Sequence, residues 1–322
     1  MKKLLTALSL GLVFVAGAQA QAWPAKPVTL LVPFPPGGST DMIARTLAPK
    51  LQEKLGGTFI VENKAGATGT VGAGQVKRAA PDGYTILVSS LGPYVIAPHL
   101  IKYVPYDALK DFDYLTVAVQ APNVLAVPAA SPHKSLADVI AYHKANPGKM
   151  SFASSGNGSS DHLTAELFWQ QTGTSGLHIP YKGGAPAMAD LLGAQVDATF
   201  MNINTGITNI KGGKLRALAI TSAERASALP EVPTLHELLG SKLAVQEAWS
   251  GLWAPARTPP EVMQRLFSAL GSTLKTPAAR KIIEAGGGQL AASASPQAYA
   301  EFIRAESAKW TEIVRLIGLT PN

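Results

Sequence analysis

Two short stretches rich in glycine, serine and threonine carry the groups best suited to holding an anion. Residues 34–41 read FPPGGSTD and residues 154–161 read SSGNGSSD. Their small residues let a ligand approach the backbone closely, and their hydroxyl groups can hydrogen-bond to it. Neither stretch contains lysine, arginine or histidine. The pattern therefore predicts an anion site built from backbone N–H groups and hydroxyls rather than from cationic side chains.

Each stretch stands between a predicted strand and a predicted helix. Residues 28–32 and 150–154 are predicted strands, and apolar residues recur every four positions after the first loop. The first N–H groups of a helix have no partner inside the helix, and the helix dipole favours an anion there. We expect Ser39 or Thr40 to cap the first helix. Because the layout occurs twice, the sequence predicts two similar domains whose helix N-termini face one cleft.

The candidate ligand-binding residues come from these two loops, from the end of a third predicted strand (84–89) and from the end of a predicted strand at 196–201. The Phe34 ring is expected either to stack on the ligand or to pack the loop, and the Asn202 amide to reach a second carboxylate of the ligand. The predicted ligand contacts are Phe34, Gly37, Gly38, Ser39, Thr40, Ser89, Ser90, Ser154, Gly156, Gly158, Ser159, Ser160 and Asn202.

Other polar and aromatic residues near these loops are interpreted as structural. A carboxylate facing an anionic ligand would repel it, so Asp41 is expected to stabilise the first helical turn instead. His162, in the first turn of the second helix, is expected to be a structural hydrogen-bonding residue. Lys182 is expected in a solvated turn, and Trp249 and Trp253 in the core or hinge.

The composition excludes several classes of function. The 322 residues include 28 Lys and Arg against 21 Asp and Glu, giving a formal charge of +7, but no basic stripe with interleaved aromatics, so nucleic-acid binding is not expected. Cysteine is absent, which removes disulfides, thiolate metal sites and a cysteine nucleophile. No H-E-x-x-H, Walker P-loop or G-x-G-x-x-G motif occurs, so neither a metal site nor a cofactor is expected.

The N-terminus is typical of a protein that is exported. Lys2 and Lys3 precede an apolar run over residues 4–16, and Ala18-Gln19-Ala20 is a small-x-small cleavage site. Residues 1–20 are therefore predicted to be a signal peptide. No later segment approaches the roughly 20 apolar residues needed to span a bilayer. We expect a periplasmic, soluble mature protein.

Strands that alternate with helices predict a parallel α/β sheet in each of two domains. Residues 93–113 are expected to be irregular. The apolar stretches 115–127 and 243–255 are predicted to cross between the domains. The predicted first domain is therefore discontinuous, with residues 21–122 plus 246–322, and the second comprises residues 123–245. Two crossings favour hinge motion.

A series of motifs along nearly all of the mature chain resembles, in order, the Bug receptor family. These are the periplasmic substrate-binding proteins of tripartite tricarboxylate transporters, also called the TctC family. The motifs are VPFPPGGSTD (32–41), VENKAGATGTVGA (61–73), AAPDGYTIL (79–87), ANPGKMSFASSGNGSSDHLTAELF (145–168), HIPYKGGAPAMADLLGAQVD (178–197) and WSGLWAPARTPPEV (249–262).

The resemblance implies a type II periplasmic binding protein fold, with two α/β domains, a ligand cleft between them and two hinge crossings. It also implies capture of a small organic carboxylate, most often a dicarboxylate or an aromatic carboxylate, and its delivery to a membrane permease without catalysis. Family members hold a ligand carboxylate through backbone amides and ordered water at loops that match residues 34–41 and 154–160. The chain is expected to act as a monomer.

One motif departs from the family, and two alternatives remain. Many members read Phe-Asp-Asn where this chain has Phe200-Met201-Asn202, so a ligand whose ammonium group needs that carboxylate is disfavoured. A periplasmic ligand sensor for a signalling partner would have the same ligand site. A secreted serine hydrolase is the other alternative, but the chain lacks a G-x-S-x-G elbow, and Asp161 beside His162 on one helix cannot readily form a triad.

Overall fold

The computed structural model describes residues 23–241 and 246–320. The predicted signal peptide and residues 243–245 of the predicted return crossing lie outside the described residues. None of the helices within the described ranges is both long and apolar enough to cross a membrane.

The chain alternates strands and helices through most of its length, as predicted. The N-terminal elements are β1 (Val28–Val32), α1 (Ser39–Leu55), β2 (Phe59–Asn63), the 3-10 turn η1 (Ala67–Gly69), α2 (Thr70–Lys77), β3 (Thr85–Ser90), the π-helical turn η2 (Gly92–Ile96) and α3 (Ala97–Leu100). The prediction that residues 93–113 are irregular was wrong for 93–100, which are helical, and for 112–113, where β4 begins. Residues 93–100 are helical because their apolar side chains pack against the sheet and α11.

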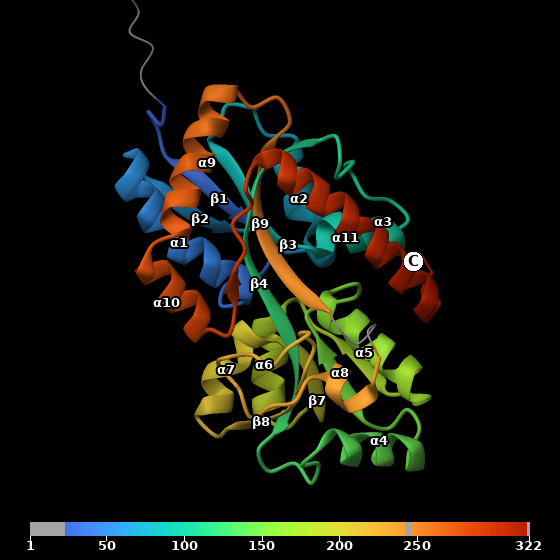
Figure 1. The fold of residues 1–322 in the computed structure, drawn as a ribbon. Helices are drawn as coiled ribbons and strands as arrows, with labels where there is room; N and C mark the ends of the chain where they lie inside the picture. Colours follow the sequence, from blue (N-terminus) through green and yellow to red (C-terminus); the bar gives the residue numbers. More distant parts are fainter. Residues whose placement is uncertain (1–22, 242–245, 321–322) are drawn as a thin grey trace, which may run out of the picture.

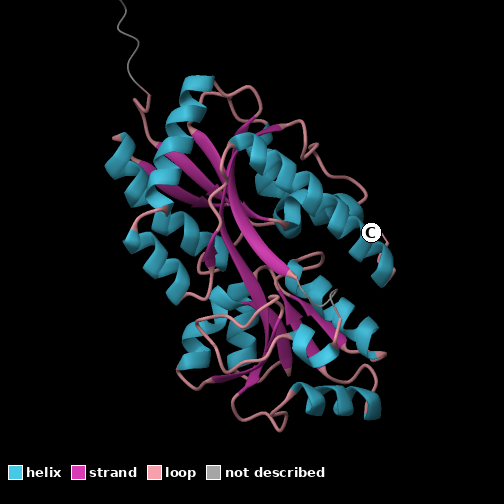
Figure 2. Ribbon diagram, in the orientation of Figure 1, coloured by secondary structure: helices cyan, strands magenta, loops and turns pink. Residues whose placement is uncertain are grey.

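The elements of the central region are β4 (Phe112–Pro128), α4 (Leu136–Ala145), β5 (Ser151–Ser154), α5 (Ser160–Thr172), β6 (Leu177–Pro180), α6 (Gly184–Leu192), β7 (Ala198–Asn202), α7 (Ile203–Lys211), β8 (Leu215–Ile220) and α8 (Leu235–Leu239). The C-terminal elements are β9 (Glu247–Pro255), α9 (Pro260–Leu274), α10 (Pro277–Ala285), β10 (Gln289–Leu290) and α11 (Pro296–Ile317). Figure 2 shows helices covering both faces of the strands.

The strands fall into two groups that share β4. One group runs β2-β1-β3-β9-β4 and the other β4-β7-β5-β6, with β8 and β10 also pairing β4. The pairs β1/β2, β1/β3, β5/β6 and β5/β7 are parallel, as predicted for strand-helix units. The long strands β4 and β9 instead pair antiparallel with their neighbours.

Strand β4 changes partner partway along its length. It pairs with β9 from Phe112 to Pro122, and with β7 from Asn123 to Ala126. In Figure 1, β4 and β9 run together from the upper group of elements towards the lower group. The two groups are therefore connected through one continuous hydrogen-bonded strand, β4.

Each group has apolar side chains packed on both faces of its strands. On β1, Leu30 faces a cluster with Leu47 and Leu266, whereas the adjacent Leu31 faces a cluster with Trp253 and Trp310. A strand buried on both faces needs apolar residues at consecutive positions, which explains the uninterrupted run over 28–32. The lower group is likewise packed on both sides, with α6 and α7 on one face and α4 and α5 on the other.

Candidate functional site

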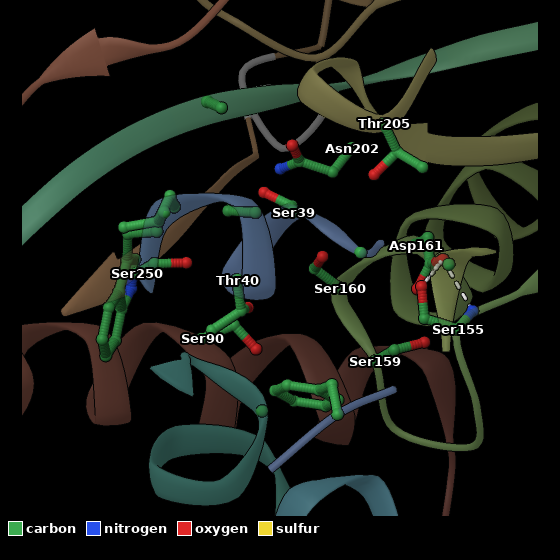
Figure 3. Close-up of a pocket in the computed structure, with 18 of the residues that line it drawn as sticks. Ser39, Thr40, Ser90, Ser155, Ser159, Ser160, Asp161, Asn202, Thr205 and Ser250 are labelled. Carbon is green, nitrogen blue, oxygen red and sulfur yellow. Dashed lines mark hydrogen bonds between the residues drawn. The ribbon is translucent and has the colours of Figure 1, made fainter. Parts of the chain in front are cut away.

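The two loops identified in the sequence meet across one small cavity. The cavity has a volume of about 80 Å³ and is lined by both loops, by the ends of β3 and β7, by the middle of β4 and by the start of β9. In Figure 3 the side chains of Ser39, Ser160 and Asn202 lie around the same space, although they come from three different elements. Segments far apart in the chain are thus brought together here.

The structure places most of the predicted site residues in this cavity but not all of them. Gly156 and Gly158 instead line a wider adjoining cavity of about 610 Å³, and Gly37, Ser89 and Ser154 line neither. Ser89 and Ser154 are buried under the loops. The predicted residues that line the cavity are Phe34, Gly38, Ser39, Thr40, Ser90, Ser159, Ser160 and Asn202.

Helix α1 presents unpaired donors to the cavity. Its N-cap is Gly38, not Ser39 or Thr40 as predicted, because these two residues already have helical positions. No side chain caps the helix, and the structure gives no hydrogen-bond partner to the N–H groups of Ser39 and Thr40 among the described residues. The Thr40 side chain is only 5% exposed and lines the cavity. These groups can therefore donate to a bound anion.

Helix α5 repeats this arrangement from the opposite side. Ser159 is the N-cap residue, but its hydroxyl donates to the carbonyl oxygen of Gly156 at 2.6 Å and does not cap the helix. The N–H of Ser160 has no partner within the described ranges. By contrast, Ser135 and Ser295 cap α4 and α11 with their hydroxyls. The two helices that begin at the predicted loops, α1 and α5, thus both have N-termini without a side-chain cap.

Asp41 holds the first loop in shape, as predicted for a structural acid. Its Oδ2 accepts hydrogen bonds from the Gly37 N–H and Arg45 Nε, both at 2.9 Å, and its Oδ1 accepts one from Asn63 Nδ2 at 2.8 Å. Burial alone would raise the pKa of Asp41, but the hydrogen bonds from Arg45, Gly37 and Asn63 outweigh burial and lower this pKa below its usual value. Asp41 therefore stays ionised and engaged with the protein.

Asp161 plays the equivalent part in the second loop. Its Oδ2 accepts hydrogen bonds from both the N–H and the hydroxyl of Ser155, each at 2.7 Å (Figure 3). Both residues line the cavity, although neither was among the predicted contacts. In the sequence, the role of Asp161 is indicated by its parallel with Asp41, because each is an acid in the first helical turn after a glycine-rich loop.

Asn202 directs an amide donor into the cavity. Its Oδ1 accepts a hydrogen bond from the Asn204 N–H at 3.2 Å and thereby caps α7. With the oxygen so engaged, the NH₂ group is available to the cavity. Thr205, in the first turn of α7, adds a hydroxyl on the same side in Figure 3. The start of α6 at Gly184 also reaches the cavity, so several helix N-termini converge there.

One wall of the cavity is apolar and comes from the crossing strands. Val119 and Ala121 of β4 and Ala248 and Trp249 of β9 line it, with the Ser250 hydroxyl beside them. Trp249 is 2% exposed, and its Nε1 donates to Glu306 at 2.8 Å, so it packs in the core as predicted and also borders the cavity. This wall was not predicted from the sequence, because residues 115–127 and 243–255 were interpreted only as crossings between the domains.

No cation lines the cavity among the described residues. Asp161 is the one ionisable residue of its lining, and its carboxylate is engaged by Ser155. Lys182 and His162 border only the wider adjoining cavity. An anion in the inner cavity would therefore be held by N–H, hydroxyl and amide donors.

Two of the hydrogen bonds between described residues cross between the two groups of elements. The Thr68 hydroxyl donates to the Asn157 carbonyl oxygen at 2.5 Å, and Gln170 Nε2 donates to the Leu316 carbonyl oxygen at 3.2 Å. Thr68 lines both the inner and the wider cavity, so its hydrogen bond lies between them. It was not predicted as a site residue, although it lies in the glycine-rich segment that follows β2.

His162 and His178 stack beneath the second loop. Their ring centroids are 3.9 Å apart, and His162 Nδ1 accepts a hydrogen bond from the Gly158 N–H at 3.1 Å, which confirms its predicted structural role. His178 Nε2 lies 2.6 Å from the Ser154 hydroxyl. Burial, together with repulsion from His162, lowers the pKa of His178 from 6.5 to about 3. This histidine therefore stays neutral at ordinary pH.

Comparison with known protein families gives one family for most of the chain. The family model described as "Tripartite tricarboxylate transporter family receptor" matches residues 43–319. Among individual proteins, BugT of Bordetella pertussis is 39% identical over 306 residues, which cover 94% of this chain and 93% of BugT.

Solved structures agree with this family and with the predicted fold. Rpa4515 of R. palustris, solved with adipate, superposes with a TM-score of 0.90 and 32% identity, covering 93% of this chain and all of that one. MatC of Rhodopseudomonas palustris, solved with bound malate, has a TM-score of 0.85 and 29% identity, covering 91% of this chain and all of MatC. The predicted two-domain α/β binding-protein fold is therefore confirmed.

Proposed function

The chain belongs to the tripartite tricarboxylate transporter receptor (TctC) family of periplasmic binding proteins, and we propose that its ligand is a small organic carboxylate held between the two domains. Members of this family are solute-binding proteins, not enzymes. The proposed site is the cavity between α1 and α5, and the proposed ligand contacts are the predicted residues that line it.

One observation carries the proposal: two uncapped helix N-termini, from opposite domains, face a cavity that no described cation lines. A helix N-terminus stabilises an anion by about 0.3–1 kcal/mol when exposed and up to about 2 kcal/mol when partly buried. Charge-assisted hydrogen bonds from N–H and hydroxyl groups add about 1.5–3 kcal/mol each. Together these contributions are compatible with micromolar binding, which corresponds to about −8 kcal/mol.

The cavity and the related structures favour a dicarboxylate or an aromatic carboxylate. Related proteins were solved with adipate and malate, both dicarboxylates. The Asn202 amide and the Thr205 hydroxyl are placed to receive a second polar group. Amino acids are disfavoured, because Met201 stands where many members of the family have an aspartate, and no described lining carboxylate is free to pair with an ammonium group.

Ligand binding is proposed to close the two domains. The proposed boundaries, 21–122 plus 246–322 and 123–245, are supported by the change of partner along β4 between Pro122 and Asn123. A ligand that touches α1 and α5 at once makes its full set of contacts only in the closed form, and so shifts the equilibrium towards it. Export to the periplasm by a cleaved signal peptide and delivery of the ligand to the permease of a tripartite transporter complete the proposal.

A thermal-shift screen tests this function. The purified protein is heated with C4–C6 dicarboxylates, citrate, aromatic mono- and dicarboxylates, acidic amino acids and neutral sugars. A carboxylate present at 100 times its dissociation constant adds about 2.7 kcal/mol of stability, which raises the melting temperature measurably. No shift with any carboxylate, together with a shift by a sugar, would overturn the proposal.

A further inference from the structure

A third cavity, larger than the proposed ligand site, shares lining residues with it. It has a volume of about 280 Å³ and lies between α1, α7 and α10. Its lining is mostly aliphatic, including Met42 and Leu47 of α1, Ile207 of α7 and Ile282 of α10. In Figure 1, α10 lies above α7 at the left of the molecule, beside α1. We refer to this space as the side cavity.

The side cavity borders the ligand site and shares two lining residues with it. Ser39 and Ile43 line both spaces. Ser39 is the first residue of α1 and one of the proposed donors to the carboxylate, so the side cavity begins next to the place where that group would bind. A ligand anchored at the start of α1 could extend directly into it.

The chemistry of the side cavity differs from that of the ligand site. No charged side chain lines it among the described residues. The Thr46 hydroxyl in its lining already donates to the Met42 carbonyl oxygen at 2.8 Å. Ile282 is 57% exposed and Met42 38% exposed, so apolar surface remains open to water there. Such a surface favours the hydrocarbon part of a ligand over a second charged group.

We propose that the side cavity receives the apolar tail of the ligand, and that this receptor therefore accepts alkyl or aryl monocarboxylates whose carboxylate lies at α1 and α5. The inference rests on the proposed function and specifies its substrate class. Two domains build the side cavity, with α1 and α10 in one and α7 in the other. Burying a tail there therefore stabilises the closed form as well as the complex.

Isothermal titration calorimetry of straight-chain monocarboxylates from C4 to C10, with phenylalkanoates and C4–C6 dicarboxylates alongside, tests the inference. Each additional buried methylene is expected to tighten binding about four-fold until the side cavity is full. The variant Thr208→Trp changes an exposed side chain of the lining and should obstruct the space without disturbing the fold. It should flatten the dependence on chain length while the affinity for dicarboxylates stays unchanged.

Two further variants make the result decisive. Ile282→Asp places a charge at the open end and should weaken only the long-chain acids. Lys211→Trp, at the end of α7 outside the side cavity, is the control and should behave as wild type. The inference about the side cavity is overturned, while the proposed function stands, in either of two cases. In the first, dicarboxylates bind but the affinity for monocarboxylates does not rise with chain length. In the second, Thr208→Trp leaves the dependence on chain length intact. If no carboxylate of any kind binds, the proposed function itself is wrong.

Discussion

At the scale of single residues, the acids nearest the cavity organise the backbone. Asp41 and Asp161 each accept hydrogen bonds from the loop that precedes their helix. This fixes the loops and leaves the N–H groups of Ser39, Thr40 and Ser160 uncapped by these side chains. A carboxylate in the protein thus helps to expose the donors that a carboxylate ligand needs.

Replacing Asp41 by asparagine should loosen the first loop. The variant Asp41→Asn keeps the shape of the side chain but removes its charge, and with it the charge-assisted bonds from Arg45 and Gly37. We expect the free energy of unfolding to fall by about 2 kcal/mol, measured by urea denaturation, and ligand affinity to fall with it. Glu53→Gln, which removes an exposed acid paired with Lys50 on the same helix, is the control. Equal stability of the two variants would contradict this role for Asp41.

His178 should make stability depend on acid pH. The unfolded chain takes up a proton near pH 6.5, whereas folded His178 does so only near its pKa of about 3. Stability is therefore complete above pH 6.5 and declines as pH falls from 6.5 towards 3. In His178→Gln the decline of melting temperature with pH should be shallower, though not absent, since burial also lowers the pKa of His99 and His143. If NMR showed that the His178 ring in the folded protein titrates near pH 6.5, this explanation of the pH dependence would be wrong.

Residue types in the two loops were sufficient to predict some of the polar groups of the cavity. Ser39, Thr40 and Ser160 followed from small polar residues at predicted helix starts. Thr68 and Ser250 could not be predicted in this way. Both reach the cavity through tertiary structure, Thr68 by contact across the cleft and Ser250 by its pairing opposite Ser90.

At the scale of elements, the loop between β2 and α2 takes an unusual conformation where it crosses the cleft. Ala67 and Thr68 have φ values of 43° and 52°, in the left-handed region that a β-branched residue rarely adopts. Such conformations cost roughly 1–3 kcal/mol each and persist where surrounding contacts impose them. Here the contact is the hydrogen bond from Thr68 to Asn157 in the other domain.

Removing that hydrogen bond should weaken closure without unfolding either domain. Thr68→Val keeps the volume and branching of the side chain but loses the hydroxyl. The loss of about 1 kcal/mol should weaken ligand affinity about five-fold by calorimetry. Thr311→Val removes a hydroxyl whose partners, the Ser307 carbonyl oxygen and His99, lie in the same domain, and it serves as control. Unchanged affinity in Thr68→Val would show that the crossing bond does not contribute to ligand binding.

Helices with a strong apolar periodicity were predicted well. Strands that depend on partners distant in the sequence were predicted less well. The four-residue spacing in α1 places Ile43, Leu47 and Leu51 in the core, and Gly173 ends α5 in the left-handed conformation. That β4 would run unbroken through Pro122 was not evident, because a proline usually interrupts a strand. Pairing with β9 up to this residue and with β7 beyond it keeps the strand continuous.

At the scale of the whole molecule, the strand β4 joins two domains of similar construction, and β9 pairs with it as far as the point where it changes partner. Each domain places helices on both faces of its strands, and the loops at the ends of β1 and β5 meet between them. Two crossing strands restrict the relative motion to bending rather than free rotation. The repeated loop-helix pattern predicted this arrangement, but the size of the cavity depends on side-chain directions that the sequence does not fix.

Ligand binding should compact the molecule. In small-angle X-ray scattering, we expect the radius of gyration to decrease when the best carboxylate from the thermal-shift screen is added, because the ligand stabilises contacts between the domains. The primary amide of the same compound is the control and should leave the radius unchanged. A carboxylate that raises the melting temperature without altering the radius would contradict closure by bending at β4 and β9.

The most direct test of the central claim compares one acid with its neutral amide by calorimetry at pH 7. If helix N-termini hold the carboxylate, the acid binds with micromolar affinity and the amide on the order of 100-fold more weakly, since the charge-assisted hydrogen bonds are lost. Ser160→Trp at the cavity should abolish binding, whereas Ser268→Trp on the exposed face of α9 should not. Equal affinity for acid and amide, or undiminished binding by Ser160→Trp, would contradict the account.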